Sequence, residues 1–170
     1  MWYVIWTTTG KEEQCKALLE HYCNGLFERI SIPTKIMQKK YQDVWKEVEI
    51  KLIPSYVFVE TGEVFEFGAE LKRLSWFAGF NNILKSDGTY APLNERDAAF
   101  IEHLCGKDDV IKPSFAVKEG DRITVTEGAL VGYEGFITKI DRHKRQAYVE
   151  LDMFGRKVKV ALGIEVLDKK

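Results

Sequence analysis

Long apolar runs are missing from this chain of 170 residues. No run approaches the roughly 20 apolar residues that a helix needs to cross a bilayer. The N-terminus also lacks the basic region, apolar core and cleavage site of a secretory signal. We therefore expect a cytoplasmic protein that does not associate with a membrane.

Cysteine is scarce, and its spacing is uninformative. The chain has 3 cysteines, an odd number without a C-x-x-C pair, which argues against a disulfide framework and against a structural zinc site. We expect Cys15, Cys23 and Cys105 to be reduced residues of helices or of the core.

Motifs for catalysis and for cofactor binding are missing as well. His21, His103 and His143 lie far apart, and no serine or cysteine nucleophile motif surrounds them. No glycine-rich phosphate loop precedes a helix. We expect a protein that is not an enzyme and that uses no cofactor or metal ion.

Charge is almost balanced over the whole chain, with 25 Lys and Arg against 26 Asp and Glu. The balance differs along the chain, because residues 1–106 carry a slight acidic excess and residues 118–170 a slight basic excess. The 45% apolar content is enough to bury one or two small cores. Composition therefore permits nucleic-acid binding by the C-terminal part without establishing it.

The N-terminal part shows the pattern of a strand followed by a helix. Residues 2–7 are a dense run of β-formers. Thr9 and Glu12 have the spacing of a capping box, which predicts a helix start. Apolar residues then recur at helical spacing from Cys15 to Cys23, and Asn24-Gly25 supplies the end of the helix.

Extended segments and two more helices follow. Residues 28–37 and 44–53 flank a polar stretch that we interpret as a hairpin tip or loop, and 38–46 is a weak candidate for DNA or polymerase contact. A strand begins after Pro54, and a short helix follows through Leu71 and Leu74. Asn94 with Asp97 predicts the cap of a third helix, which completes an α+β unit.

The C-terminal part has the pattern of short strands. We interpret residues 107–117 as a linker, since they lack a periodic pattern. From Gly120 onward, alternation predicts a small β-barrel with strands at about 122–126, 135–140, 146–152, 156–161 and 163–167. Val158 and Val160 should face its interior, and Lys157 and Lys159 should point outward.

Basic residues are concentrated at two predicted turns of this barrel. The run 141–145 reads Asp-Arg-His-Lys-Arg, and Phe154-Gly155-Arg156 forms the second turn. Turns between short strands place cations where a phosphate backbone can reach them. The alternative is a solvated turn that keeps the barrel soluble.

Three stretches carry a resemblance to the NusG family of transcription elongation factors. They are Trp2-Tyr3-Val4, the strand from Pro54 to Glu60, and the run from Gly135 to Ile140. The resemblance spans essentially the whole chain. It implies an N-terminal antiparallel sheet with flanking helices, the NGN-like domain (1–106), then the linker and a five-stranded SH3-like KOW barrel (118–170).

Within the family, the segments 134–145 and 153–156 most resemble the specialised paralogs called LoaP. Ser55 stands where the general factor has glycine, and residues 74–82 also depart from its pattern. The resemblance therefore implies a processive antitermination factor that acts as a monomer. The alternatives are a general NusG-like elongation factor without specific RNA recognition and a ribosome-associated KOW protein that binds RNA.

The resemblance also implies two binding surfaces. An aromatic depression in the N-terminal domain would hold the clamp helices of the RNA polymerase largest subunit, and the matching residues are Tyr3, Tyr56, Phe58, Trp76, Phe77 and Phe80. Several of these can instead fill the core. A nascent RNA hairpin would bind the basic turns, for which the candidate residues are Arg142, His143, Lys144, Arg145, Arg156, Lys157 and Lys159.

Overall fold

The computed structural model describes residues 1–74, 80–153 and 155–169. No helix within these residues is long and apolar enough to span a membrane. The expected mixture of helices and sheets is confirmed. The chain divides into two compact units, Met1–Ile32 with Ile53–Ala98 and Asp152–Arg156, and Pro33–Leu52 with Ala99–Leu151 and Lys157–Lys170.

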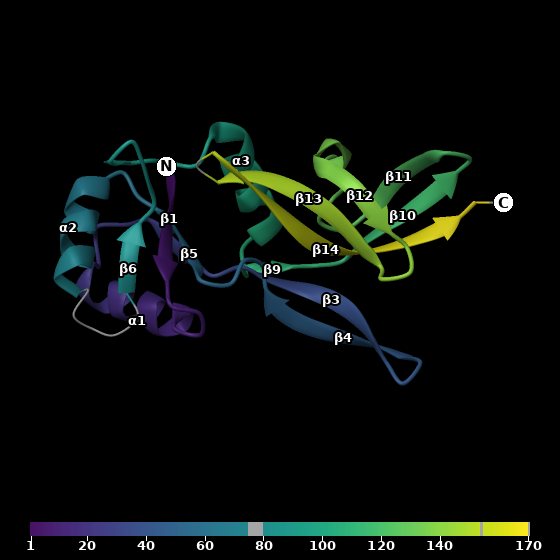
Figure 1. The fold of residues 1–170 in the computed structure, drawn as a ribbon, viewed down its shortest axis with the longest axis horizontal. Coiled ribbons are helices and arrows are strands. Elements are labelled where there is room, and N and C mark those ends of the chain that lie inside the picture. Colours follow the sequence, from purple (N-terminus) through teal and green to yellow (C-terminus); the bar gives the residue numbers. More distant parts are fainter. Residues whose placement is uncertain (75–79, 154, 170) are drawn as a thin grey trace. The chain divides into compact units, whose positions relative to one another are not determined.

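A four-stranded antiparallel sheet forms the centre of the first unit (Figure 1). Its order is β2-β5-β1-β6. The strands are β2 (Arg29–Ser31), β5 (Tyr56–Glu60), β1 (Trp2–Thr7) and β6 (Phe80–Ile83). Because the chain alternates faces along a strand, the sheet presents two different sets of side chains.

One face of this sheet packs against two helices, α1 (Glu12–Tyr22) and α2 (Val64–Leu74). The core holds side chains from β1, β5 and both helices, among them Tyr3, Ile5, Leu19, Val57, Val59, Phe67 and Leu71. The opposite face carries Trp6 and Tyr56, which are paired across β1 and β5. Trp2, Val4 and Phe58 share that opposite face and are buried, whereas Trp6 is exposed.

All three cysteines are buried free thiols, as expected. Burial raises the pKa of Cys15 to about 12 and that of Cys23 to about 11. A thiol with so high a pKa stays protonated at neutral pH and is a poor nucleophile. These cysteines serve packing.

The start of α1 differs from the predicted capping box. Lys11 is the N-cap residue, and it makes no side-chain cap hydrogen bond. Glu12 is fully buried, and its carboxylate accepts hydrogen bonds from the backbone N–H groups of Gly10 and Ser55, both at 2.8 Å. Glu12 therefore links the helix start to the turn before β5, where Ser55 has the left-handed φ of 73°.

Replacing Glu12 with alanine is expected to destabilise the protein by about 2–4 kcal/mol, because it leaves two backbone donors without their charged acceptor. Glu13, one residue later and exposed, gives the matched control, for which a change within about 0.5 kcal/mol is expected. Urea unfolding of both variants measures the difference. Equal midpoints for the two variants would contradict this role of Glu12.

The third helix, α3 (Glu95–Cys105), begins with the predicted cap. The Asn94 side chain accepts the backbone N–H of Asp97 at 2.8 Å and donates to its carboxylate at 2.9 Å. That carboxylate also accepts the N–H of Asp152 at 2.7 Å. The short hairpin β7 (Lys85–Ser86) and β8 (Thr89–Tyr90) precedes α3.

A five-stranded sheet in the order β11-β10-β14-β13-β12 dominates the second unit. The strands of this part of the chain are β9 (Val110–Ile111), β10 (Ser114–Glu119), β11 (Arg122–Glu127), β12 (Ile137–Asp141), β13 (Gln146–Met153) and β14 (Arg156–Asp168). The 3-10 turn η1 (Glu134–Phe136) precedes β12. Regular structure begins earlier than predicted, since the segment 107–117 contains β9 and the first residues of β10.

The two predicted strands at 156–161 and 163–167 are wrong as separate elements, because β14 is continuous. Gly163 lies inside it, where a Cβ atom would come within 2.8 Å of the Ile36 carbonyl oxygen. Glycine therefore permits a close backbone approach here and does not end the strand.

The predicted faces of β13 and β14 are confirmed. Ala147, Val149 and Leu151 are buried, as is Val160, whereas Lys157 and Lys159 are exposed. The period-two pattern was sufficient here because one face of each strand is covered.

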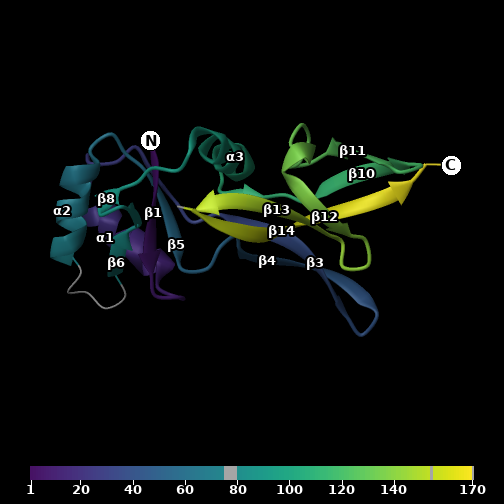
Figure 2. The same ribbon diagram turned by 45° about the horizontal axis from the view of Figure 1, so that its top comes forward.

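A long hairpin, β3 (Thr34–Tyr41) and β4 (Val44–Lys51), belongs to the second unit (Figure 2). Gln42 and Asp43 have φ of 47° and 64°, as in a type I′ turn, so the predicted hairpin tip is confirmed. Lys35 is buried on β3 and donates to the Ala161 carbonyl at 2.6 Å. Burial lowers the pKa of Lys35, and nearby Lys39 lowers it further.

Candidate functional site

The basic run 142–145 forms the tight turn between β12 and β13. The Asp141 carboxylate accepts the backbone N–H of Lys144 at 3.0 Å. This hydrogen bond, the largest of several effects, lowers the pKa of Asp141. Arg142, His143 and Lys144 are exposed, so the turn presents three basic side chains to solvent.

The Arg142 guanidinium is held by β14 while the side chain stays 41% exposed. Its guanidinium donates to the Val166 carbonyl at 3.2 Å and to the Asp168 carboxylate at 3.1 Å. The hydrogen bond from Arg142 lowers the pKa of Asp168. One edge of the guanidinium is therefore oriented by β14, and a planar fork of this kind has further donors for a phosphate.

Arg145 faces a different partner within the same unit. Its guanidinium lies over the Trp45 ring, 4.2 Å from the centroid, and donates to the Gln38 side chain. The β3–β4 hairpin is thus attached to the basic turn by a cation–π contact and a hydrogen bond.

The other predicted RNA-binding residues fall in two places. Lys157 and Lys159 lie on β14 in the second unit, and the Lys159 ammonium is 5.7 Å from the Tyr148 ring centroid. Arg156 belongs to the first unit, where it follows Gly155 in a turn with a left-handed φ of 82°. Within the second unit, the structure therefore brings 142–145 together with the hairpin.

An aromatic hollow of about 440 Å³ lies in the first unit. Trp6 is its most prominent aromatic residue, 52% exposed and directly opposite Tyr56 in the β1–β5 register. The rest of the lining is Leu84, Lys85, Met153 and Arg156. The prediction omitted Trp6, although its position two residues after Val4 and four after Trp2 placed it on the face opposite Tyr3.

The residues predicted for polymerase binding are not all at this hollow. Tyr56 lines it. Phe58 is fully buried on the same strand face as Tyr56. Tyr3 is 6% exposed in the helix-covered core, where burial raises the pKa of Tyr3. Phe80 lies in β6, and Trp76 and Phe77 are outside the described residues.

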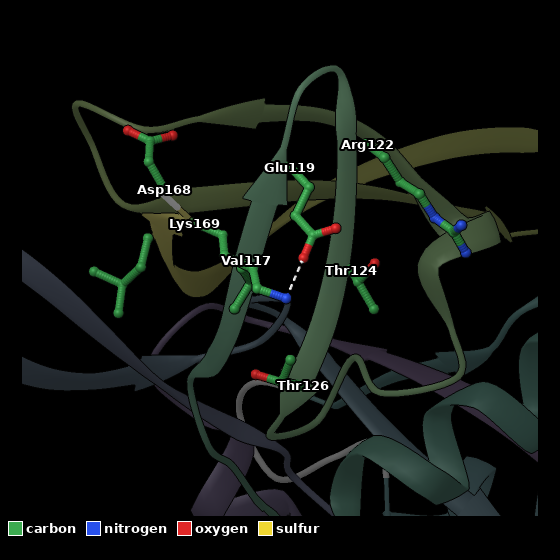
Figure 3. Close-up of a pocket in the computed structure, with 8 residues that line it drawn as sticks. Val117, Glu119, Arg122, Thr124, Thr126, Asp168 and Lys169 are labelled. Atoms are coloured by element: carbon green, nitrogen blue, oxygen red, sulfur yellow. Dashed lines mark ion pairs between the residues drawn. The ribbon is translucent and has the colours of Figure 1, made fainter.

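A hollow of about 550 Å³ lies on the second unit between the ends of β10, β11 and β14. Figure 3 shows Val117 and Glu119 on one strand beside Thr124 and Thr126 on the next. An ion pair of 2.6 Å between Glu119 and Lys169 lies across it. None of the residues predicted from the sequence lines this hollow, and its charges are balanced.

Among the described residues, His, Cys, Asp and Glu side chains form no group of three or more that can hold a metal ion. His103 has a packing role, since its ring stacks on Tyr133 at 4.3 Å and its Nε2 lies 2.9 Å from the Ala129 carbonyl oxygen.

Comparison with known proteins identifies the family. The family described as transcription termination factor nusG matches residues 1–102. The transcription termination/antitermination protein NusG of Lactococcus lactis is 31% identical over 173 residues, which cover 98% of this chain and 91% of the relative. The protein of the same name from Thermus thermophilus is 28% identical over 179 residues, covering 99% and 97%. The chain therefore belongs to the NusG family of transcription termination and antitermination factors.

Proposed function

We propose that this protein is a processive antitermination factor of the LoaP type. It binds elongating bacterial RNA polymerase through an N-terminal domain (1–106) and a nascent leader RNA hairpin through a KOW domain (118–170). The observation that carries the RNA-binding part is the β12–β13 turn, on which three consecutive basic side chains are exposed. Residues 107–117 connect the domains, and the five-stranded sheet of the second unit closes into an SH3-like barrel.

Polymerase binding is assigned to the hollow that contains Trp6 and Tyr56. Two partly exposed aromatic side chains beside Leu84 and Met153 suit the apolar face of a partner helix, such as a clamp helix of the largest subunit. Burying each ring contributes about 1.5–3 kcal/mol. Tyr3 and Phe58 support this surface from the core. Phe80, Trp76 and Phe77 are further residues that we assign to polymerase binding.

RNA binding is assigned to the basic turn, with Lys157 and Lys159 as further cations and Arg156 as a separate contact. Helical RNA is recognised mainly through its shape and its phosphates, and sequence is read at loops and bulges. A turn with one oriented arginine and several mobile cations meets the first requirement. The protein acts in the cytoplasm as a monomer.

A salt titration of RNA binding tests the proposal. Purified full-length protein is mixed with the 5′ leader RNA of the operon that encodes it, and with a scrambled RNA of equal length. We expect tight binding to the leader that persists at moderate salt. Equal and weak binding to both RNAs, lost as salt rises, would leave only nonspecific electrostatics and favour a general elongation factor.

A further inference from the structure

We propose that the second unit holds a single unpaired nucleotide of the RNA in a hollow between the β3–β4 hairpin and the basic turn, with its base stacked on Tyr41. This inference deepens the proposed function and rests on it for the source of the RNA. The hollow has a volume of about 320 Å³. Its lining combines aromatic and basic side chains, namely Lys39, Lys40, Tyr41, Trp45, His143 and Lys144.

The hollow has a fixed frame. Arg145 lies over the Trp45 ring and donates to Gln38, a residue 107 positions earlier in the chain. Gln38 and Trp45 are on the same face of the β3–β4 ribbon, because Gln38 pairs with Glu47 and Lys40 pairs with Trp45. Lys39 and Tyr41 alternate to the other face, so the hollow reaches around the ribbon. The hairpin and the turn are therefore joined before any ligand arrives, which lowers the ordering cost of binding.

Tyr41 supplies the stacking surface. It is 50% exposed at the end of β3, whereas one face of the Trp45 ring is already covered by Arg145. A base stacked on an exposed aromatic ring gains about 1–3 kcal/mol whatever its identity. The hollow thus suits a nucleotide that has left a helix.

The outer edge of β3 offers backbone hydrogen-bonding groups to a ligand in the hollow. β9 pairs with β3 only at Thr34 and Lys35, so within the described residues the outer edge of β3 beyond Lys35 has no strand partner. In a two-residue hairpin the two residues next to the turn, here Tyr41 and Val44, exchange both backbone hydrogen bonds with each other. Because hydrogen-bonded and non-hydrogen-bonded pairs alternate along the ladder, the next pair, Lys40 and Trp45, makes none with each other. The backbone N–H and C=O of Lys40 therefore point outward, where a base edge can meet them.

The charge around the hollow favours an anionic ligand. Lys39 lies directly across the ribbon from Lys46, and such like-charge pairs are destabilising unless a counter-charge is present. Acidic groups in the same region already have basic or backbone partners. Asp43 lies 3.3 Å from the Lys40 ammonium, and the Asp141 carboxylate accepts the backbone N–H of Lys144. The ammonium groups of Lys39 and Lys144 can therefore approach the phosphate of a nucleotide.

The test compares Tyr41→Ala with Tyr41→Phe in binding to the leader hairpin and to copies that carry one abasic site at each loop position. We expect Tyr41→Ala to lose about tenfold or more in affinity, since 1.4 kcal/mol is a factor of ten, and Tyr41→Phe to keep it. One abasic position should weaken the wild-type protein and have no effect on Tyr41→Ala. The control is Phe65→Ala, which removes an exposed ring from α2 of the first unit.

A second measurement keeps this inference separate from leader recognition. The same variants are tested with a short oligouridylate and with an RNA duplex of equal length. Wild-type protein should prefer the single strand, and Tyr41→Ala should lose that preference even if the leader and a scrambled RNA bind alike. Equal binding of the single strand by wild type and Tyr41→Ala would overturn the stacking site. The site would also be overturned if polyglutamate, an anionic chain without bases, displaced the RNA equally well from wild type and from Tyr41→Ala.

Discussion

Replacing Arg142 and Arg145 together with alanine should lower the affinity for the leader hairpin by about tenfold to a hundredfold at moderate salt. The guanidinium of the exposed Arg142 is oriented by β14, and Arg145 holds the hairpin beside the turn. If each cation meets one phosphate, the slope of log affinity against log salt should also become shallower by about 1.4 to 1.8. Filter binding or fluorescence anisotropy at several salt concentrations measures both quantities.

The matched control is the double variant Lys118→Ala and Arg122→Ala, which removes two cations from the β10–β11 hairpin of the same unit. Its affinity and salt slope should stay close to wild type. The single variant Arg142→Ala separates direct RNA contact from support of the hairpin, because the Arg142 guanidinium bonds to Val166 and Asp168 of β14, whereas Arg145 holds the hairpin. Unchanged affinity and slope in the double arginine variant would remove the turn from the RNA surface.

Binding to RNA polymerase should depend on the two aromatic residues of the first-unit hollow. We expect Trp6→Ala or Tyr56→Ala to cost about 2 kcal/mol each, or roughly thirtyfold in affinity, because each removes an apolar ring from the contact. Biolayer interferometry with immobilised core polymerase measures the change.

Phe65→Ala is the matched control for this effect. Phe65 is 73% exposed on α2 in the same unit, so its removal takes away an aromatic ring without touching the hollow. RNA binding should be unchanged in all three variants. A Trp6→Ala protein that binds polymerase as well as wild type, or a loss of the same size in Phe65→Ala, would place the polymerase surface elsewhere.

Local patterns were sufficient to predict several elements of this fold. Alternation predicted the faces of β13 and β14 because one side of each strand is buried. Asn94 and Asp97 predicted the start of α3 because the cap is a contact within four residues. In both cases the determining interaction lies inside the segment that shows the pattern.

Contacts between distant segments could not be predicted in this way. The spacing of Thr9 and Glu12 indicated a capping box, but Glu12 instead accepts the N–H of Ser55, 43 residues later. The sequence around Gly163 predicted a break between two strands. The glycine is instead required by the nearby Ile36 backbone, which is distant in the sequence and so gave no local pattern. The place of Arg156 beside Tyr56 depends on tertiary packing in the same manner.

The β3–β4 hairpin is synthesised well before the residue that anchors it. Its strands leave the ribosome long before Arg145, the residue that later covers Trp45, so the nascent hairpin has an exposed indole and an unpaired edge for most of translation. Its two-residue turn lets it close locally and early. Attachment to the basic turn must then wait until Arg145 has been synthesised, and a chain truncated before Arg145 would carry a hairpin without its anchor.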